Sequence, residues 1–151
     1  MAINFYFEQQ INLKNRKGLK LFIASIFKRE ERGLSSLAYI FCSDEYLLKM
    51  NMQYLSHDYY TDIISFDLSQ SKRSPTHGEV YISAERVKEN AKINRVPVID
   101  ELHRVIFHGA LHLCGYKDKT KPQKILMRSK EDYYLKKYFN LVPRGTTDSI
   151  S

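Results

Sequence analysis

The chain has 151 residues, of which 43% are hydrophobic and 27% charged, a length and composition that suit one globular domain with its own core. No apolar run is long enough to span a membrane. The net charge is +7, from 24 Lys and Arg against 17 Asp and Glu, which favours a polyanionic partner such as RNA over a membrane.

The first half of the chain alternates between strand and helix patterns. Residues 3–7 are aromatic and β-branched and predict an edge strand. Apolar residues at helical spacing predict a helix over 18–27. The compact apolar run 37–42 predicts a buried strand, and a helix follows over 44–54. Residues 61–68 predict a third strand.

The second half contains the longer helices. A turn-rich loop leads to a fourth strand at 78–82, and a helix is predicted at 84–94. Apolar spacing over 99–107 predicts a buried helix. Residues 120–123, Thr-Lys-Pro-Gln, are typical of a helix start with a capping box, and the last helix continues over 125–139.

This order of elements predicts an α+β fold. The loop between the third and fourth strands suits an antiparallel pair better than a parallel crossover. We therefore expect a mixed four-stranded sheet that about five helices cover mainly on one face. We expect a single domain over residues 1–151, with 142–151 a disordered tail. The N-terminus has no basic segment followed by an apolar one, and neither cysteine belongs to a C-x-x-C pair, so we expect a cytoplasmic protein.

The residues after the buried helix form a metal-ligand pattern, H-x3-H-x2-G-x2-D. Residues i and i+4 of a helix lie on one face, so His108 and His112 can direct two imidazoles at one point. Gly115 permits the backbone to leave the helix, because glycine adopts positive φ without steric cost. The chain can then bring Asp118 back as a third ligand. Two histidines and one carboxylate leave a fourth position open, as in a catalytic zinc site.

An ordinary half-buried histidine pair is the alternative interpretation of His108 and His112. The glycine at the helix end and the acid three residues later favour the metal site. The pattern is similar to the H-E-x-x-H-x-x-G-x-x-H signature of metzincin proteases. Their general base, the Glu after the first His, is Gly109 here, so the pattern is that of a poor peptidase.

Further segments extend the pattern. Residues 108–116 have the sequence HGALHLCGY, residues 61–66 TDIISF and residues 78–80 GEV, with Asn51 and Tyr54 upstream. In this order and spacing they resemble the YbeY family of bacterial rRNA-maturation endoribonucleases, whose motifs are HGxLHLxGY, T-[DN]-V-L-S-F and G-D-I. The resemblance covers most of the chain.

The resemblance implies an α+β fold with the metal at the C-terminal end of a long helix. It implies a metal-dependent, single-strand-specific endoribonuclease that acts in 16S rRNA 3′ end maturation and in ribosome quality control. The implied cofactor is one zinc ion per chain, and the implied partners are the 16S rRNA precursor and the small ribosomal subunit. A water activated by the metal is the expected nucleophile, and no residue is assigned as general base.

Two positions depart from the family pattern. Most members end the motif with Asp-His, where this chain has Lys117-Asp118. A carboxylate is an accepted zinc ligand, and its charge predicts a weaker Lewis acid that admits other divalent ions more easily. The alternative is a solvent-exposed Asp118 and no complete site. The family also usually has an Arg where this chain has Leu55, so either Lys117, Lys119 or Arg73 replaces it, or RNA cleavage is weaker.

Several side chains near these motifs are candidates for RNA binding. Lys117 and Lys119 can hold phosphates, or they form part of a solvated basic turn. Tyr59, Tyr60 and Tyr116 can stack on bases, although burial in a core is the commoner role of tyrosine. Two other functions stay open at this point: a non-catalytic ribosome-associated factor with a structural metal, and another metal-dependent hydrolase such as a peptidase.

Overall fold

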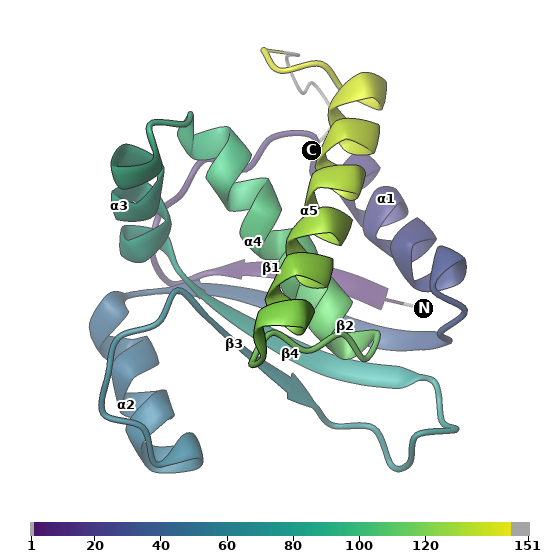
Figure 1. The fold of residues 1–151 in the computed structure, drawn as a ribbon, viewed down its shortest axis with the longest axis horizontal. Helices are drawn as coiled ribbons and strands as arrows, with labels where there is room; N and C mark the ends of the chain where they lie inside the picture. Colours follow the sequence, from purple (N-terminus) through teal and green to yellow (C-terminus); the bar gives the residue numbers. More distant parts are fainter. Residues whose placement is uncertain (1, 146–151) are drawn as a thin grey trace.

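A computed structural model of the chain describes residues 2–145. Within them the strands are β1 (Ala2–Phe7), β2 (Leu34–Cys42), β3 (Ile63–Asp67) and β4 (Thr76–Ser83). They form one sheet in the order β1-β2-β4-β3 (Figure 1), in which β1, β2 and β4 are parallel and β3 is antiparallel to β4. The edge position of β1 and the antiparallel pairing of β3 with β4 are therefore confirmed.

The helices of the described part are α1 (Arg16–Arg29), α2 (Asp44–Leu55), α3 (Ala84–Asn94), α4 (Val98–Leu113) and α5 (Lys121–Leu141). Figure 1 shows α1, α3, α4 and α5 over one face of the sheet and α2 against the other. This arrangement confirms the α+β prediction. No helix within residues 2–145 is long and apolar enough to cross a membrane. The single-domain assignment stays a prediction, and residues 146–151 of the expected tail lie outside the described part.

Two hydrophobic clusters pack on the two faces of the sheet. The larger one joins the sheet to α1, α4 and α5, and includes Ile23, Phe107 and Tyr134. Burial of each such side chain contributes about 1.5–3 kcal/mol. The smaller cluster lies under α2 and consists of Cys42, Leu47, Met50 and Ile64. Because most of the apolar surface of α4 faces the larger cluster, this helix is held rigidly at the centre of the molecule.

The predicted capping box at the start of α5 is present. The Thr120 hydroxyl accepts a hydrogen bond from the Gln123 backbone N–H at 3.3 Å, and Gln123 Oε1 accepts one from the Thr120 N–H at 3.0 Å. Gln123 Oε1 also accepts from the Lys119 N–H at 3.1 Å. The cap therefore fixes both the first turn of α5 and the end of the loop that precedes it.

His103 is a core histidine. The residue is 2% exposed, its ring stacks on Tyr138, and its Nδ1 lies 2.7 Å from the Ile99 carbonyl oxygen. Burial lowers the pKa of His103 to about 4, although the Ile99 hydrogen bond opposes this shift. The folded protein therefore keeps this imidazole neutral at a pH where the unfolded chain protonates it.

We expect His103 to make the protein less stable in mild acid. Below the ordinary pKa of 6.5 the unfolded state takes up a proton that the folded state does not, so the free energy of unfolding falls as pH falls toward about 4. His103→Phe should remove on the order of 3 kcal/mol of this loss. Denaturant unfolding of both proteins over this pH range measures the difference, and parallel pH profiles would contradict the prediction.

Candidate metal centre

The last turns of α4 bring His108 and His112 together on one face. Their ring centroids lie 4.5 Å apart with an interplanar angle of 78°. The opposite faces of this part of α4 are apolar and pack on the sheet, with Phe107 and Leu111 fully buried. The i, i+4 spacing predicted from the sequence therefore directs both imidazoles away from the core and toward the same point.

The backbone reverses immediately after α4 in a Schellman motif. The Tyr116 N–H donates to the Leu111 carbonyl at 3.0 Å, and the Gly115 N–H donates to the His112 carbonyl at 2.9 Å. Gly115 has a φ of 103°, a conformation that L side chains rarely adopt. The predicted role of this glycine is thus confirmed, and the turn directs the following residues back toward the two histidines.

Asp118 completes the cluster. Its Oδ2 lies 3.3 Å from His108 Nε2 and its Oδ1 lies 3.4 Å from His112 Nε2. The three residues offer donor atoms that all lie within 4.8 Å of one another. An ion with tetrahedral geometry and ligands at ~2.1 Å separates neighbouring ligand atoms by roughly 3.4 Å. The donor set and its spacing therefore fit a zinc-type ion.

Glu131 of α5 contacts His108 through Nδ1, the ring nitrogen that is not directed at Asp118. Its Oε2 lies 2.6 Å from His108 Nδ1, and its Oε1 accepts from Arg104 Nη1 at 2.8 Å. The Glu131 side chain is only 6% exposed. A carboxylate on Nδ1 places the proton there and leaves Nε2 free as a ligand. No local pattern in the sequence points to this residue, which lies 23 positions after His108.

The two histidines have opposite pKa shifts. Burial lowers the pKa of His108, but the hydrogen bond and charge of Glu131, with the charge of Asp118, outweigh burial and raise it. Burial and the neighbouring His108 lower the pKa of His112. Ligation requires neutral imidazole, so His112 becomes available to a metal at a lower pH than His108.

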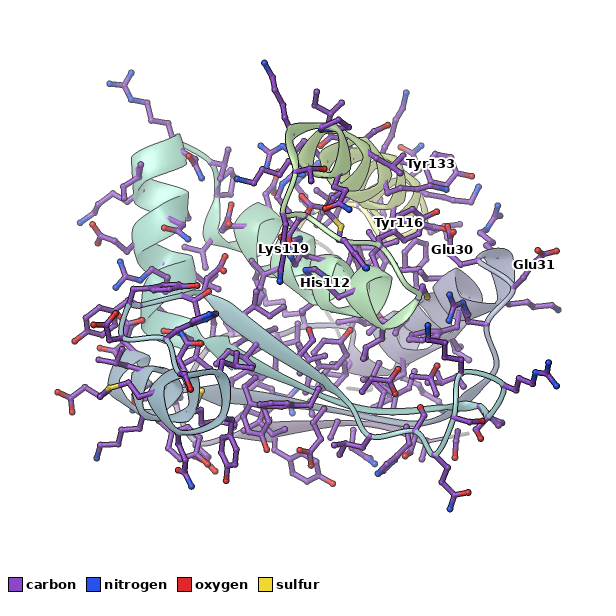
Figure 2. All side chains as sticks on the ribbon, turned by 60° about the horizontal axis from the view of Figure 1, so that its bottom comes forward. Glu30, Glu31, His112, Tyr116, Lys119 and Tyr133 are labelled. Atoms are coloured by element: carbon purple, nitrogen blue, oxygen red, sulfur yellow. The ribbon has the colours of Figure 1, made fainter. Side chains whose placement is uncertain are left out.

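A second carboxylate fixes the turn between the candidate ligands. Glu30 accepts hydrogen bonds from the hydroxyls of Tyr116 at 2.6 Å and Tyr134 at 2.5 Å, and from Lys130 Nζ at 3.3 Å. Burial raises the pKa of Glu30, but these donors outweigh it and the net shift is downward. Figure 2 shows Tyr116 beside Glu30. Tyr116 therefore anchors the turn to α1 and α5, and Lys130 Nζ lies 5.4 Å from the centroid of its ring.

The candidate ligands line a cavity of about 760 Å³, to which α2 and its following loop, β3, α4 and α5 contribute. Lys119 lines this cavity together with His112 (Figure 2). Lys117 is exposed and, like Arg73, is not part of the lining. Arg128 of α5 lines the cavity and was not predicted, because a single cation on an amphipathic helix carries no local signal.

Residues of the family-like strand also reach the cavity. Asp62 and Ser65 both line it, as does Leu55 at the end of α2. Burial raises the pKa of Asp62, against the effect of the His108 charge. Among the described residues, the buried Ser65 hydroxyl has no hydrogen-bond partner. A polar ligand in the cavity would satisfy this hydroxyl.

Gly109 lies on the face of α4 that packs against the sheet. A Cβ at this position would lie 2.7 Å from Val80 Cγ1 and 3.1 Å from Ile63 Cδ1. The branched valine cannot easily rotate away. A glutamate here would be directed into the sheet and not toward the metal centre, so the packing as well as the sequence excludes a metzincin-type base.

Comparisons with known proteins agree over nearly the whole chain. The family model described as Endoribonuclease YbeY matches residues 4–139. A curated Endoribonuclease YbeY from Cytophaga hutchinsonii is 51% identical over 130 residues, which cover 85% of this chain and 90% of the relative. Another from Flavobacterium psychrophilum is 46% identical over 134 residues, or 89% and 94%. The solution structure of a Thermotoga maritima protein matches with a TM-score of 0.64 and 25% identity, covering 100% of this chain and 99% of that one.

Proposed function

The chain belongs to the YbeY endoribonuclease family, and we propose that its active centre is one zinc ion held by His108, His112 and Asp118. The observation that carries this proposal is the convergence of three donor atoms within 4.8 Å on the wall of a cavity. Two histidines and a carboxylate suit zinc and leave a position open for substrate or water.

The bound ion would supply Lewis-acid polarisation of a phosphoryl oxygen and activation of a water. The side chains around the ion would orient its ligands and hold the phosphodiester. Glu131 keeps His108 in the tautomer that presents Nε2. Lys119 and Arg128 place positive charge along the cavity that the phosphodiester must enter. The negative charge of Asp118 reduces the net charge of the centre, so the ion should be a weaker Lewis acid than one bound by three histidines.

The proposed substrate is single-stranded RNA, and within it the 3′ end of the 16S rRNA precursor. The small ribosomal subunit is the proposed partner, with ribosome quality control and a cytoplasmic location as parts of the same proposal. The family resemblance supports these assignments, together with the net charge of +7 and the cations that line the cavity.

Leu55 is the observation that favours one alternative, a ribosome-associated factor with a structural metal. An apolar side chain lines the cavity where the family usually has an arginine. Lys119 and Arg128 of the same cavity supply cationic groups in its place, so we favour the nuclease.

Removal of the ion is expected to distinguish the nuclease from the ribosome-associated factor with a structural metal. A chelator should stop cleavage of single-stranded RNA, and stoichiometric zinc should restore it, because the three ligands provide the only metal-ligand cluster found within residues 2–145. Zinc content, gel assays on single-stranded and duplex rRNA-like substrates, and circular dichroism make the comparison. A folded, zinc-loaded protein that binds small subunits and cleaves no RNA would instead support the structural-metal alternative.

A further inference from the structure

The loop between α2 and β3 presents an aromatic pair to the cavity. The rings of His57 and Tyr59 stack with centroids 5.0 Å apart and an interplanar angle of 21°, and the Tyr59 hydroxyl lies 3.0 Å from His57 Nδ1. Both residues line the cavity that contains the candidate ligands. Tyr59 nevertheless stays 55% exposed, so much of its surface remains accessible although one ring face is covered.

A buried asparagine holds this pair in place. Asn51 of α2 is 2% exposed. Its carbonyl accepts the His57 N–H at 3.0 Å, and its Nδ2 donates to the Tyr59 carbonyl at 2.9 Å. One residue of a helix thereby fixes both members of the pair. A preformed aromatic surface loses little conformational entropy when a planar ligand stacks on it.

A group of cations lies at the start of α5. Arg128 lines both the metal cavity and a second hollow of about 470 Å³, and Lys121 and Lys124 line that second hollow. All three side chains are exposed. Arg128 is the lining residue that the two hollows have in common. Arg128 lines the same cavity as His57 and Tyr59, so one extended ligand that crosses this cavity can contact both the aromatic pair and the cations.

We infer that His57 and Tyr59 form a base-stacking site, and that RNA runs from it past the metal centre to phosphate contacts with Arg128, Lys121 and Lys124. This inference rests on the proposed function and adds the path of the strand across the site. Aromatic faces and a cationic groove are the two elements of single-strand recognition. A paired base has no free face to offer, so the site selects unpaired nucleotides.

The chain contains no tryptophan, which makes a single introduced indole a specific reporter. The indole fluorescence of the Tyr59→Trp variant should be quenched when the protein is mixed rapidly with a short oligoadenylate, because an adenine stacks on the new ring. Tyr60→Trp is the matched control: Tyr60 is in the same loop and 51% exposed, but it packs on Arg86 at 5.3 Å and is outside the cavity lining. An abasic oligomer of equal length supplies the same phosphates without bases.

If the stacking site exists, fluorescence is strongly quenched only in the Tyr59→Trp variant, and only by the oligoadenylate that carries bases. The site also predicts that Tyr59→Ala weakens oligoadenylate binding on the order of tenfold, whereas Tyr59→Phe does not. Equal quenching at positions 59 and 60, or equal quenching by the abasic oligomer, would overturn the inference. Cleavage is scored separately. Selective quenching without cleavage supports the site and counts against the nuclease, and cleavage without selective quenching overturns the site alone.

The phosphate contacts have their own control on the same helix. Arg128→Ala should weaken binding of both the oligoadenylate and the abasic oligomer by severalfold and reduce the salt slope by about one. Lys136→Ala removes an exposed cation of α5 that lies outside both hollows and should change neither quantity. Equal effects of the two substitutions would show that only the overall charge attracts RNA, and would overturn the proposed path.

Discussion

Replacing Asp118 with alanine is expected to remove the zinc ion and reduce RNA cleavage by about a hundredfold or more. The substitution leaves two imidazoles whose Nε2 atoms have lost the carboxylate at 3.3 and 3.4 Å. Two nitrogen ligands from one helix hold zinc far more weakly than three ligands. Metal content by mass spectrometry and cleavage of a labelled single-stranded RNA measure the two losses together.

Two further substitutions make this test specific. Asp118→His supplies the third ligand that the family resemblance implies at this position, and should recover both metal and cleavage in part. Lys117→Ala alters the neighbouring, exposed residue, which offers no metal ligand, and should leave the zinc content unchanged. If Asp118→Ala keeps a full complement of zinc, Asp118 is not a ligand, and the proposed centre is wrong.

Glu131→Gln is expected to weaken both the fold and the metal site. The carboxylate is almost fully buried between Arg104 and His108. Removal of its charge leaves Arg104 partly unpaired, which should cost about 2–3 kcal/mol of unfolding free energy. The loss of a carboxylate behind a ligating histidine typically reduces metal affinity about 10- to 100-fold. Denaturant unfolding and zinc competition with a chromophoric chelator measure the two effects.

Asp132→Asn is the matched control on the same helix. Asp132 accepts from the same Arg104 at 2.6 Å, but its side chain is 60% exposed, and no contact joins it to His108. Exposed ion pairs contribute roughly 0–1 kcal/mol, so this variant should lose little stability and no zinc affinity. Unchanged zinc affinity in Glu131→Gln would mean that the contact between the Glu131 carboxylate and His108 Nδ1 does not contribute to zinc binding.

The candidate site was predicted best where its chemistry is local in sequence. His108 and His112 share a face because of helical periodicity, and Gly115 ends the helix because it accepts a positive φ. Asp118 follows three residues later, so the loop can bring it back. These relations depend on a few neighbouring residues and survive in any tertiary context.

The residues that the sequence did not reveal act across long separations. Glu131 and Arg128 belong to α5, and reach the site only because that helix packs on α4. Asn51 matches a position of the family pattern, but the sequence does not show what this residue does. In the structure it forms hydrogen bonds to His57 and Tyr59 and so holds their loop. Leu55, at the position where the family resemblance implies an arginine, lines the cavity.

The sequence by itself determined the elements, the α+β class, the antiparallel pairing of β3 with β4, and the three candidate ligands. Periodicity, capping residues and glycine conformation are local properties of the chain, and each can be recognised within a short window. Only the tertiary structure decided the strand order, the support of His108 by Glu131, the anchoring of Tyr116 by Glu30, and the aromatic and cationic lining of the cavity. Those contacts depend on how the helices pack on the sheet, because packing joins residues whose separation in sequence carries no periodic signal.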